Sequence, residues 1–375
     1  MCRVSIKKTT IPELKFKRRS GMKLQNYALG QWIEGSGKQV ELYNAVNGEI
    51  VATTSTEGID FKAMLDYARN TGGTSLRKLT FHERAHALKS LALHLLTKKD
   101  LFYNISFKTG ATKIDSWIDI EGGIGNLFVM SGKGRRELPN DYLCIDGNPE
   151  ILSKGGTFIG HHIYTPKHGV AVHINAFNFP VWGMLEKIAV NLLAGVPAVV
   201  KPATVTSYLT EAVVKEIIAS KILPEGSLQL ICGSARDLLD YVSHQDVVTF
   251  TGSATTGKML KAHPTIIENS VPFNMEADSI NCSILGPDVT PDSDDFQVFI
   301  KEVAKEITVK AGQKCTAIRR AIVPENMIEA VSNALSERLT KTTIGDPLNE
   351  KVRMGSLAGM TQLREVQEKI EELKS

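Results

Sequence analysis

Long apolar runs and cysteine are both scarce in this sequence of 375 residues. No apolar run approaches the roughly 20 residues that a membrane-spanning helix needs, so we expect no membrane partner. The cysteines are odd in number, widely scattered and free of any Cys-x-x-Cys pair. This usage favours free thiols in a reducing compartment and predicts a cytoplasmic protein. The five cysteines are Cys2, Cys144, Cys232, Cys282 and Cys315.

A large charge of one sign is also absent, because 44 Lys and Arg face 41 Asp and Glu. Residues 1–21 hold seven of the basic side chains and one acidic side chain, so the rest of the chain is mildly acidic. This balance gives no support for nucleic-acid binding. We expect residues 1–21 to be a disordered N-terminal extension, followed by a plausible second start at Met22.

One helix is well marked in the first part of the chain, at residues 80–98. Thr80 and Glu83 form a capping box ahead of an apolar stripe. The same helix contains a His-Glu-x-x-His pattern, with His82 and His86 on one face. A catalytic zinc ion needs a third protein ligand, and none follows at the expected offset. We therefore expect no metal site.

Short strands and turns surround this helix. Strands are expected at residues 27–33, 40–43 and 49–52. Residues 142–164 are typical of a hairpin, with turns expected at residues 146–149 and 155–156. Gly122-Gly123-Ile124-Gly125 does not fit a nucleotide-binding loop, because Phe128 occupies the position of the third glycine. That segment instead favours a helix start or close packing.

Strands and helices alternate from residue 169 onward. Buried strands are predicted at residues 169–174, 197–202, 227–232 and 247–251. Helices are predicted at residues 181–193, 206–220 and 235–242, and from residue 254. This alternation is typical of βαβ units, which build a parallel sheet with helices on both faces. The sequence therefore predicts an α/β fold whose Rossmann-like sheet binds a nucleotide at the carboxyl ends of its strands.

Polar and glycine residues follow these strands. Gly252, Ser253 and Gly257 combine a glycine turn with a helix start, where backbone N–H groups and the helix dipole favour a pyrophosphate. Asn178 follows the first of these strands with an amide donor, and Lys201 ends the second strand with a cation. We expect these side chains to meet at one edge of the sheet.

Cys315 follows a predicted helix at residues 294–309 and precedes a predicted strand at residues 318–324. Gly312 allows a sharp turn there, so the thiol can face a pocket and attack a carbonyl carbon. The alternative is that Cys315 is a small buried hydrophobe, as free cysteines often are. Glu276 adds a carboxylate between apolar neighbours, which suits a general base.

These features together resemble the aldehyde dehydrogenase superfamily. The segments that carry the resemblance are Asn178-Phe179-Pro180, Lys201-Pro202-Ala203, Leu223-Pro224-Glu225-Gly226, Phe250-Thr251-Gly252-Ser253, Glu276 and Gly312-Gln313-Lys314-Cys315. The resemblance implies oxidation of an aldehyde to an acid with NAD or NADP. It also implies that Cys315 forms a thiohemiacetal and then a thioester, that Asn178 holds the oxyanion, and that Glu276 activates water.

A finer resemblance points to semialdehyde dehydrogenases that act on CoA-linked intermediates of phenylacetate and benzoate breakdown. Residues 175–180, 275–279 and 312–320 carry it. It implies a small CoA-linked aldehyde as substrate and, for full-length members, a homo-oligomer. The finer likeness leaves open an acylating dehydrogenase, in which CoA rather than water takes the acyl group, although Glu276 counts against it.

The sequence departs from the family pattern at three places. Thr204 stands where a Glu often binds ribose hydroxyls, so NADP is expected to be accepted at least as well as NAD. Ala277-Asp278 replaces a double glycine after the catalytic Glu. The chain also ends at Ser375 without the later Glu-x-Phe-Gly-Pro segment. The alternative that this chain is an inactive remnant therefore stays open. In that case we expect the chain to be poorly soluble and to lack part of the oligomer interface.

The resemblance also implies a division into domains. Residues 22–278 are expected to form an NAD(P)-binding domain, from which the hairpin at residues 142–164 projects for oligomerisation. Residues 279–375 are expected to form a partial α/β catalytic domain, truncated before its later strands.

Overall fold

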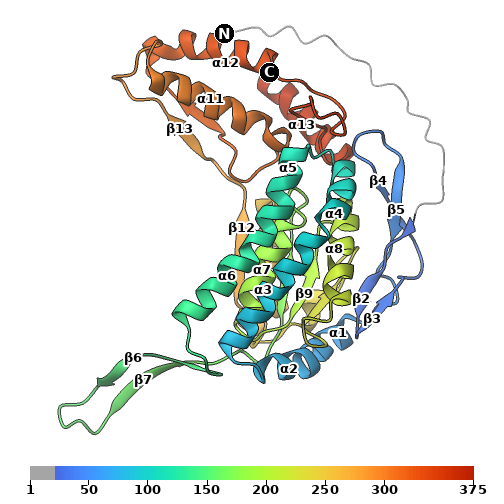
Figure 1. The fold of residues 1–375 in the computed structure, drawn as a ribbon, viewed down its shortest axis with the longest axis vertical. Helices are drawn as coiled ribbons and strands as arrows, with labels where there is room; N and C mark the ends of the chain where they lie inside the picture. The colour runs from blue at the N-terminus through green and yellow to red at the C-terminus, as the bar shows by residue number, and fades with distance from the viewer. Residues whose placement is uncertain (1–21) are drawn as a thin grey trace.

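A computed structural model describes residues 22–375, and the expectation for residues 1–21 lies outside this range (Figure 1). A seven-stranded sheet forms its centre, in the order β12-β11-β8-β9-β10-β2-β3. Its strands are β2 (Asn26–Ala28), β3 (Gln31–Ile33), β8 (Ala171–Ile174), β9 (Ala198–Lys201), β10 (Leu228–Leu230), β11 (Val247–Gly252) and β12 (Phe273–Ala277).

The five strands from β12 to β10 are parallel, as the alternation of strands and helices predicted. Strand β9 shows how the sheet divides the core: Ala198 and Val200 pack on one face and Val199 packs on the other. Both faces are therefore covered, which explains why these strands read as continuous apolar runs rather than as alternating ones. Strands β2 and β3 extend the sheet as an antiparallel hairpin.

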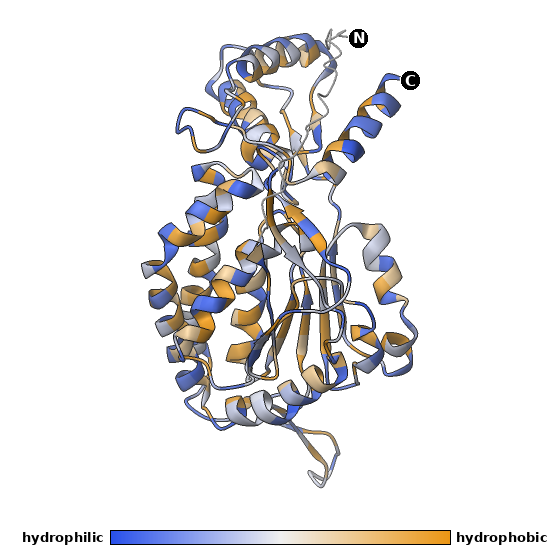
Figure 2. Cartoon of the chain, turned by 90° about the vertical axis from the view of Figure 1, so that its right-hand side faces the viewer, coloured by the Kyte–Doolittle hydropathy of each residue, from blue (hydrophilic) through white to orange (hydrophobic). Residues whose placement is uncertain are grey.

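Helices form a layer on each face of the sheet. On one face α3, α6 and α7 lie side by side in front of the strands in Figure 1. That layer consists of α3 (Phe81–Thr97), α4 (Lys99–Ser106), α6 (Gly123–Glu137), α7 (Trp182–Leu193) and α8 (Ser207–Ala219). The opposite layer consists of α1 (Phe61–Tyr67), the 3₁₀ turn η5 (Leu238–Tyr241), α9 (Ala254–Lys261) and α10 (Pro264–Glu268). Figure 2 shows apolar positions facing the strands.

Two smaller sheets lie outside this body. One consists of β1 (Met22–Lys23), β5 (Ile50–Thr54) and β4 (Val40–Tyr43). The other is the hairpin of β6 (Cys144–Ile151) and β7 (Ile159–Tyr164), which projects away from the body in Figure 1. Short connecting elements are η1 (Ala68–Gly72), α2 (Gly73–Arg77), η2 (Phe107–Thr109), α5 (Lys113–Trp117), η3 (Ile118–Gly122) and η4 (Thr204–Thr206).

Three local predictions are wrong, each because of a left-handed residue. The expected strand 27–33 is a hairpin, since Leu29 (φ 54°) and Gly30 (φ 76°) form a two-residue turn. Residues 146–149 are an irregularity inside β6, with Gly147 at φ 70°, and the chain reverses only at the second expected turn, where the Gly156 N–H donates to the Ser153 carbonyl. The expected helix 235–242 shrinks to η5, because Arg236 has φ 35° and interrupts it.

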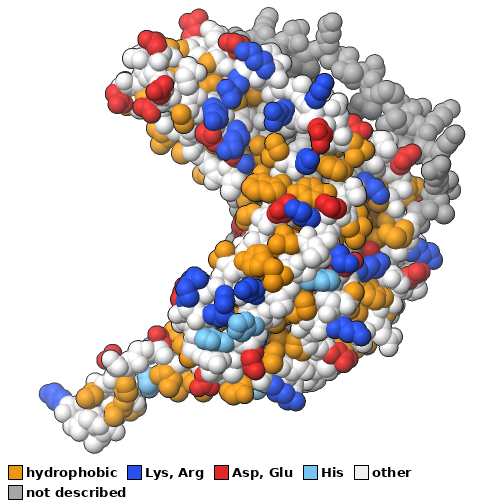
Figure 3. Space-filling view, viewed as in Figure 1, with side chains coloured by type: hydrophobic (Ala, Val, Ile, Leu, Met, Phe, Trp, Pro, Cys, Tyr) orange, Lys and Arg blue, Asp and Glu red, His pale blue; other side chains and the backbone are white. Residues whose placement is uncertain are grey.

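The last part of the chain forms a separate lobe with its own apolar cluster, between α11 and α12. Its elements are β13 (Cys282–Ile284), α11 (Asp294–Thr308), η6 (Val309–Gly312), β14 (Arg320–Ile322), η7 (Glu325–Met327), α12 (Ile328–Thr340) and α13 (Met360–Lys374). Figure 3 shows a hollow between this lobe and the body below it. None of the helices described in residues 22–375 combines the length and the apolar character that a membrane span requires.

Candidate active site

Glu276 lies on the edge strand β12, beside the end of β11. The parallel register pairs Glu276 with Thr251, whose hydroxyl donates to Glu276 Oε2 at 3.4 Å. The expectation of an apolar setting is wrong, because alternation along an edge strand turns Glu276 outward and leaves it exposed. An exposed carboxylate at the carboxyl end of a parallel sheet can reach a bound substrate or a water molecule.

Cys315 lies in a turn between η6 and β14, as the sequence predicted. Three consecutive residues before it are left-handed: Lys310 (φ 55°), Ala311 (φ 52°) and Gly312 (φ 71°). Only glycine adopts this conformation without steric cost, so the first two store strain in the approach to the nucleophile. Cys315 is exposed, so the alternative of a buried hydrophobe is wrong.

The backbone of this turn is held by two side chains that the sequence reading missed. The Ser279 hydroxyl donates to the Cys315 carbonyl at 2.5 Å, and Asn281 Nδ2 donates to the same carbonyl at 2.6 Å. Both residues lie between β12 and β13, so they fix the Cys315 turn relative to the strand that carries Glu276. Isolated Ser and Asn residues in a loop give no distinctive signal in one sequence.

Local desolvation and charge set the state of the Cys315 thiol. Desolvation raises the pKa of Cys315, and the charge and hydrogen bonding of Glu276 raise it further. The backbone N–H groups of Cys315 and Thr316 act in the opposite direction. The thiol, the Glu276 carboxylate and the backbone donors therefore influence one another within one site. Such an arrangement is expected for a nucleophile beside a general base.

Asn178 lies in the loop between β8 and α7. Its Oδ1 accepts from the Phe179 backbone N–H at 3.1 Å, which leaves the amide Nδ2 group as a donor. The loop ends where Asp119 Oδ1 accepts from the backbone N–H groups of Val181 (3.1 Å) and Trp182 (2.8 Å). Asp119 therefore caps the start of α7 and fixes the loop that presents Asn178.

A buried ionic group connects the Asn178 loop to the Cys315 turn. Lys310 is buried, its Nζ lies 5.9 Å from the centre of the Phe179 ring, and its backbone N–H donates to Asp115 Oδ1 at 2.8 Å. Burial raises the pKa of Asp119 to about 6, an effect that the charge of Lys310 opposes. Of these residues, only Asp115 belongs to a pattern that can be recognised in the sequence, the Thr112-x-x-Asp115 capping box at the start of a helix.

The segment expected to bind a phosphate runs from the end of β11 into the start of α9. Ser253 caps α9, and its hydroxyl accepts from the Thr256 backbone N–H at 3.3 Å. A Cβ on Gly257 would lie 2.5 Å from Met275 Sδ, so glycine lets α9 pack closely on β12. Gly252 ends β11. The N-terminus of α9 thus opens at the carboxyl end of the parallel sheet.

Lys201 and Thr204 lie at the same edge, two strands away from Gly252. Lys201 ends β9, burial lowers its pKa, and among residues 22–375 it has no recorded ion pair. Thr204 starts η4 directly after it. An unpaired ammonium, a free hydroxyl and a helix N-terminus fit the phosphates and ribose of a dinucleotide.

His82, the first histidine of the His-Glu-x-x-His pattern, has a backbone partner. His82 Nε2 lies 2.9 Å from the Leu138 carbonyl oxygen. Within the described part of the chain, no three His, Cys, Asp or Glu side chains gather as metal ligands.

Comparison with protein families decides the assignment of this site. The profile of the aldehyde dehydrogenase family matches residues 32–375, which include every site residue described above. The chain belongs to the aldehyde dehydrogenase family. The match extends from β3, an edge strand of the central sheet, through the Cys315 turn to the last helix.

Individual aldehyde dehydrogenases give a closer view. The chain is 44% identical over 342 residues to 3,4-dehydroadipyl-CoA semialdehyde dehydrogenase of Aromatoleum evansii, covering 91% of this chain and 66% of that protein. It is 27% identical over 344 residues to alpha-ketoglutaric semialdehyde dehydrogenase of Bacillus subtilis, covering 90% and 67%. The chain spans about two thirds of the length of these curated relatives.

Solved structures share the fold. A Bacillus cereus aldehyde dehydrogenase in complex with NAD⁺ superposes with a TM-score of 0.81 at 22% identity, covering 94% of this chain and 70% of that one. An NADP-dependent enzyme of E. coli gives a TM-score of 0.80 at 21% identity, covering 92% and 69%. The predicted aldehyde dehydrogenase fold is thus confirmed.

Proposed function

We propose that this chain carries the cofactor sheet and the nucleophile of an NAD(P)-dependent dehydrogenase that oxidises a CoA-linked semialdehyde to an acid. The observation that carries the proposal is the Cys315 turn itself, which Ser279 and Asn281 fasten close after the strand that bears Glu276, at the carboxyl end of the parallel sheet. The 44% identity to a CoA-semialdehyde dehydrogenase supports the substrate class.

In this proposal Cys315 Sγ, as thiolate, forms a bond to the aldehyde carbon, and the carbonyl electron pair moves to oxygen. Asn178 Nδ2 and the Cys315 backbone N–H donate to that oxyanion. When the oxyanion collapses, the C–H bond breaks and a thioester remains on Cys315. A bound nicotinamide supplies the acceptor for the departing hydride.

Glu276 then completes the reaction. Its carboxylate takes a proton from water, the water oxygen bonds to the thioester carbon, and the C–S bond breaks to release the acid and Cys315. A carboxylate exposed beside the thiol suits this hydrolysis. The position of Glu276 also counts against the acylating alternative. In that reaction CoA, not water, attacks the thioester, so no residue is needed to activate water.

Lys201, Thr204 and the Gly252–Gly257 turn are the residues that would hold the dinucleotide. Thr204 carries no charge to repel a 2′-phosphate, and the Lys201 ammonium can pair with one. We therefore expect NADP to be used at least as well as NAD. Thr204→Glu should shift the preference toward NAD by roughly tenfold or more, because like charges then face each other.

The test is cofactor reduction by the purified chain with 3,4-dehydroadipyl-CoA semialdehyde, run with NAD and with NADP. Cys315→Ala should abolish turnover, whereas Cys282→Ala, the matched change at another exposed cysteine, should not. Glu276→Gln should accumulate a thioester on Cys315, visible as an intact-mass increase. Turnover by Cys315→Ala would refute the assignment, and intact dinucleotide binding without any turnover would support the inactive alternative.

A further inference from the structure

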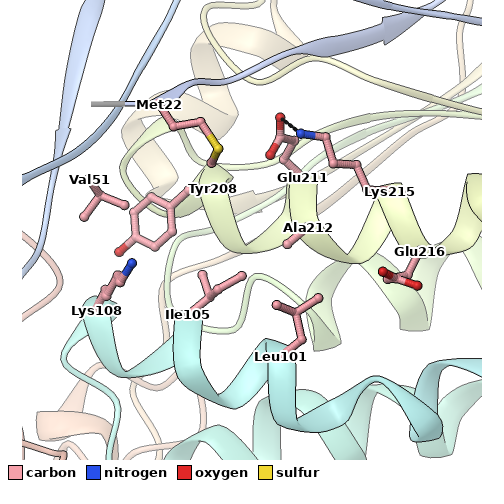
Figure 4. Close-up of a pocket in the computed structure, with 10 residues that line it drawn as sticks. All are labelled: Met22, Val51, Leu101, Ile105, Lys108, Tyr208, Glu211, Ala212, Lys215 and Glu216. Carbon is pink, nitrogen blue, oxygen red and sulfur yellow. Dashed lines mark ion pairs between the residues drawn. The ribbon is translucent and has the colours of Figure 1, made fainter. Parts of the chain in front are cut away.

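A pocket lies away from Cys315 and Glu276, between α4, α8 and the small β1-β5-β4 sheet (Figure 4). It has a volume of about 430 Å³, which is within the usual range for small-molecule sites. Leu101 and Ile105 of α4 form one apolar wall, and Ala212 of α8 forms another. None of the residues assigned above to catalysis or to the dinucleotide lines it.

The phenol of Tyr208 is the first polar group of this pocket. Tyr208 is only 2% exposed, and its hydroxyl has no hydrogen-bond partner within residues 22–375. Burial raises the pKa of Tyr208, so the hydroxyl stays protonated and can donate. A buried donor without an acceptor is costly, which makes this hydroxyl a strong candidate for contact with a ligand.

Lys108 supplies the second polar group. In Figure 4 the Tyr208 hydroxyl and the Lys108 ammonium point toward the same end of the pocket. Among the described residues Lys108 has no ion pair, whereas the other charges are neutralised. Glu211 pairs with Lys215 at 2.8 Å, and Glu216 pairs with Lys98 at 3.2 Å. One unpaired positive charge therefore faces the cavity beside a buried donor.

We infer that this pocket binds a small amphipathic monocarboxylate. Its carboxylate accepts from the Tyr208 hydroxyl and pairs with Lys108, while its apolar body lies against Leu101, Ile105 and Ala212. One ammonium and one hydroxyl suit a singly charged carboxylate better than a phosphate, which is bound by several donors or a guanidinium. The inference does not depend on the proposed dehydrogenase activity.

Isothermal titration calorimetry of the full chain with octanoate tests this inference. Octanoate should bind with a dissociation constant of about 1 mM or below, and 1-octanol, which has the same chain length without the charge, should bind at least about tenfold more weakly. Lys108→Met should weaken octanoate binding about tenfold and remove its salt dependence. Lys89→Met, a matched change at an exposed lysine of α3 outside the pocket, should leave binding unchanged.

Tyr208→Phe provides an independent arm, since it keeps the ring and removes only the hydroxyl. The variant should unfold at the same temperature as the parent or higher, because an unpartnered buried donor is lost, yet it should bind octanoate about threefold or more weakly. Equal binding of octanoate and 1-octanol, or unchanged octanoate affinity in both Lys108→Met and Tyr208→Phe, would overturn the inference. A clearly lower unfolding temperature for Tyr208→Phe would also do so, because the hydroxyl would then have a partner within the protein.

Discussion

The reactivity of a single thiol depends on its neighbours more than on its own chemistry. At Cys315 the neighbouring carboxylate of Glu276 suits the later hydrolysis but disfavours the thiolate that must form first. The backbone N–H groups of Cys315 and Thr316 offset part of this effect, because they donate to the thiolate. Glu276 thus favours hydrolysis of the thioester but disfavours ionisation of the Cys315 thiol. The pH dependence of thiol reactivity can measure the second effect by itself.

We therefore expect Cys315 to be alkylated by iodoacetamide mainly at alkaline pH. Its raised pKa places the midpoint of the rate above that of an ordinary cysteine, since only the thiolate reacts. Glu276→Gln removes the negative charge, so the midpoint should fall and labelling at pH 8 should accelerate roughly two- to fivefold. Peptide mass spectrometry separates Cys315 from the exposed Cys282, and Glu268→Gln on the exposed face of α10 serves as the control. An unchanged midpoint in Glu276→Gln would show that the carboxylate does not act on the thiol.

At the scale of whole elements, close contact between helices positions the Asn178 loop. Helix α7 starts directly after that loop and packs alongside α6. A Cβ on Gly123 would lie 2.8 Å from Trp182 Cα and 3.0 Å from Trp182 N, which are backbone atoms that cannot rotate away. Glycine at this position therefore sets the distance between α6 and α7, as the close-packing interpretation of residues 122–125 predicted.

Gly123→Ala should separate the two helices and lower the free energy of unfolding by about 2 kcal/mol, as overpacking of a tight contact usually does. Gly125→Ala is the matched control, because no atom lies within 4 Å of the added Cβ. That change should leave stability equal or raise it by up to about 1 kcal/mol through helix propensity. Urea denaturation measures both values, and equal stability losses in the two variants would contradict the packing argument.

The same elements show what a single sequence can predict. The helix at Phe81–Thr97 and the strand at Val40–Tyr43 were predicted closely, because capping residues and apolar periodicity act locally. Apolar periodicity in α11 predicts one stripe of Phe296, Ile300, Val303 and Ile307; the first three are buried, but Ile307 is 41% exposed, so the prediction is wrong there. Burial at the end of a helix depends on which neighbour is present, and periodicity alone does not contain that information.

Contacts between distant segments were not predictable. The buried position of Lys310 results from Asp115 and Asp119, almost 200 positions earlier in the chain. Asp278 stands where a double glycine was expected and adopts φ 49°, so the structure keeps the left-handed turn with a residue that tolerates it better than most. Contacts with distant segments hold a residue in such a strained conformation, so the local sequence does not reveal it.

At the scale of the whole molecule, the lobe that carries Cys315 differs from the sheet that carries the cofactor residues. The central sheet is covered on both faces, whereas β13 and β14 form a two-stranded parallel sheet with exposed apolar side chains. Ile284 is 68% exposed, and its direct cross-strand partner Ile322 is 49% exposed. Partners in register lie on one face of a sheet, so the two isoleucines form a continuous apolar patch beside strand edges that are unpaired within residues 22–375.

This patch should make the isolated chain associate with itself and limit its solubility. Replacing both residues, as Ile284→Thr with Ile322→Thr, keeps β-branched side chains but removes apolar surface, so association should fall while the free energy of unfolding changes by only about 0.5 kcal/mol. Light scattering during size-exclusion chromatography over a concentration series measures the apparent mass. Ile267→Thr on α10 is the control, since Ile267 is 63% exposed but lies outside this sheet. A monodisperse parent chain, or a double variant that associates as strongly as the parent, would show that this patch does not drive association.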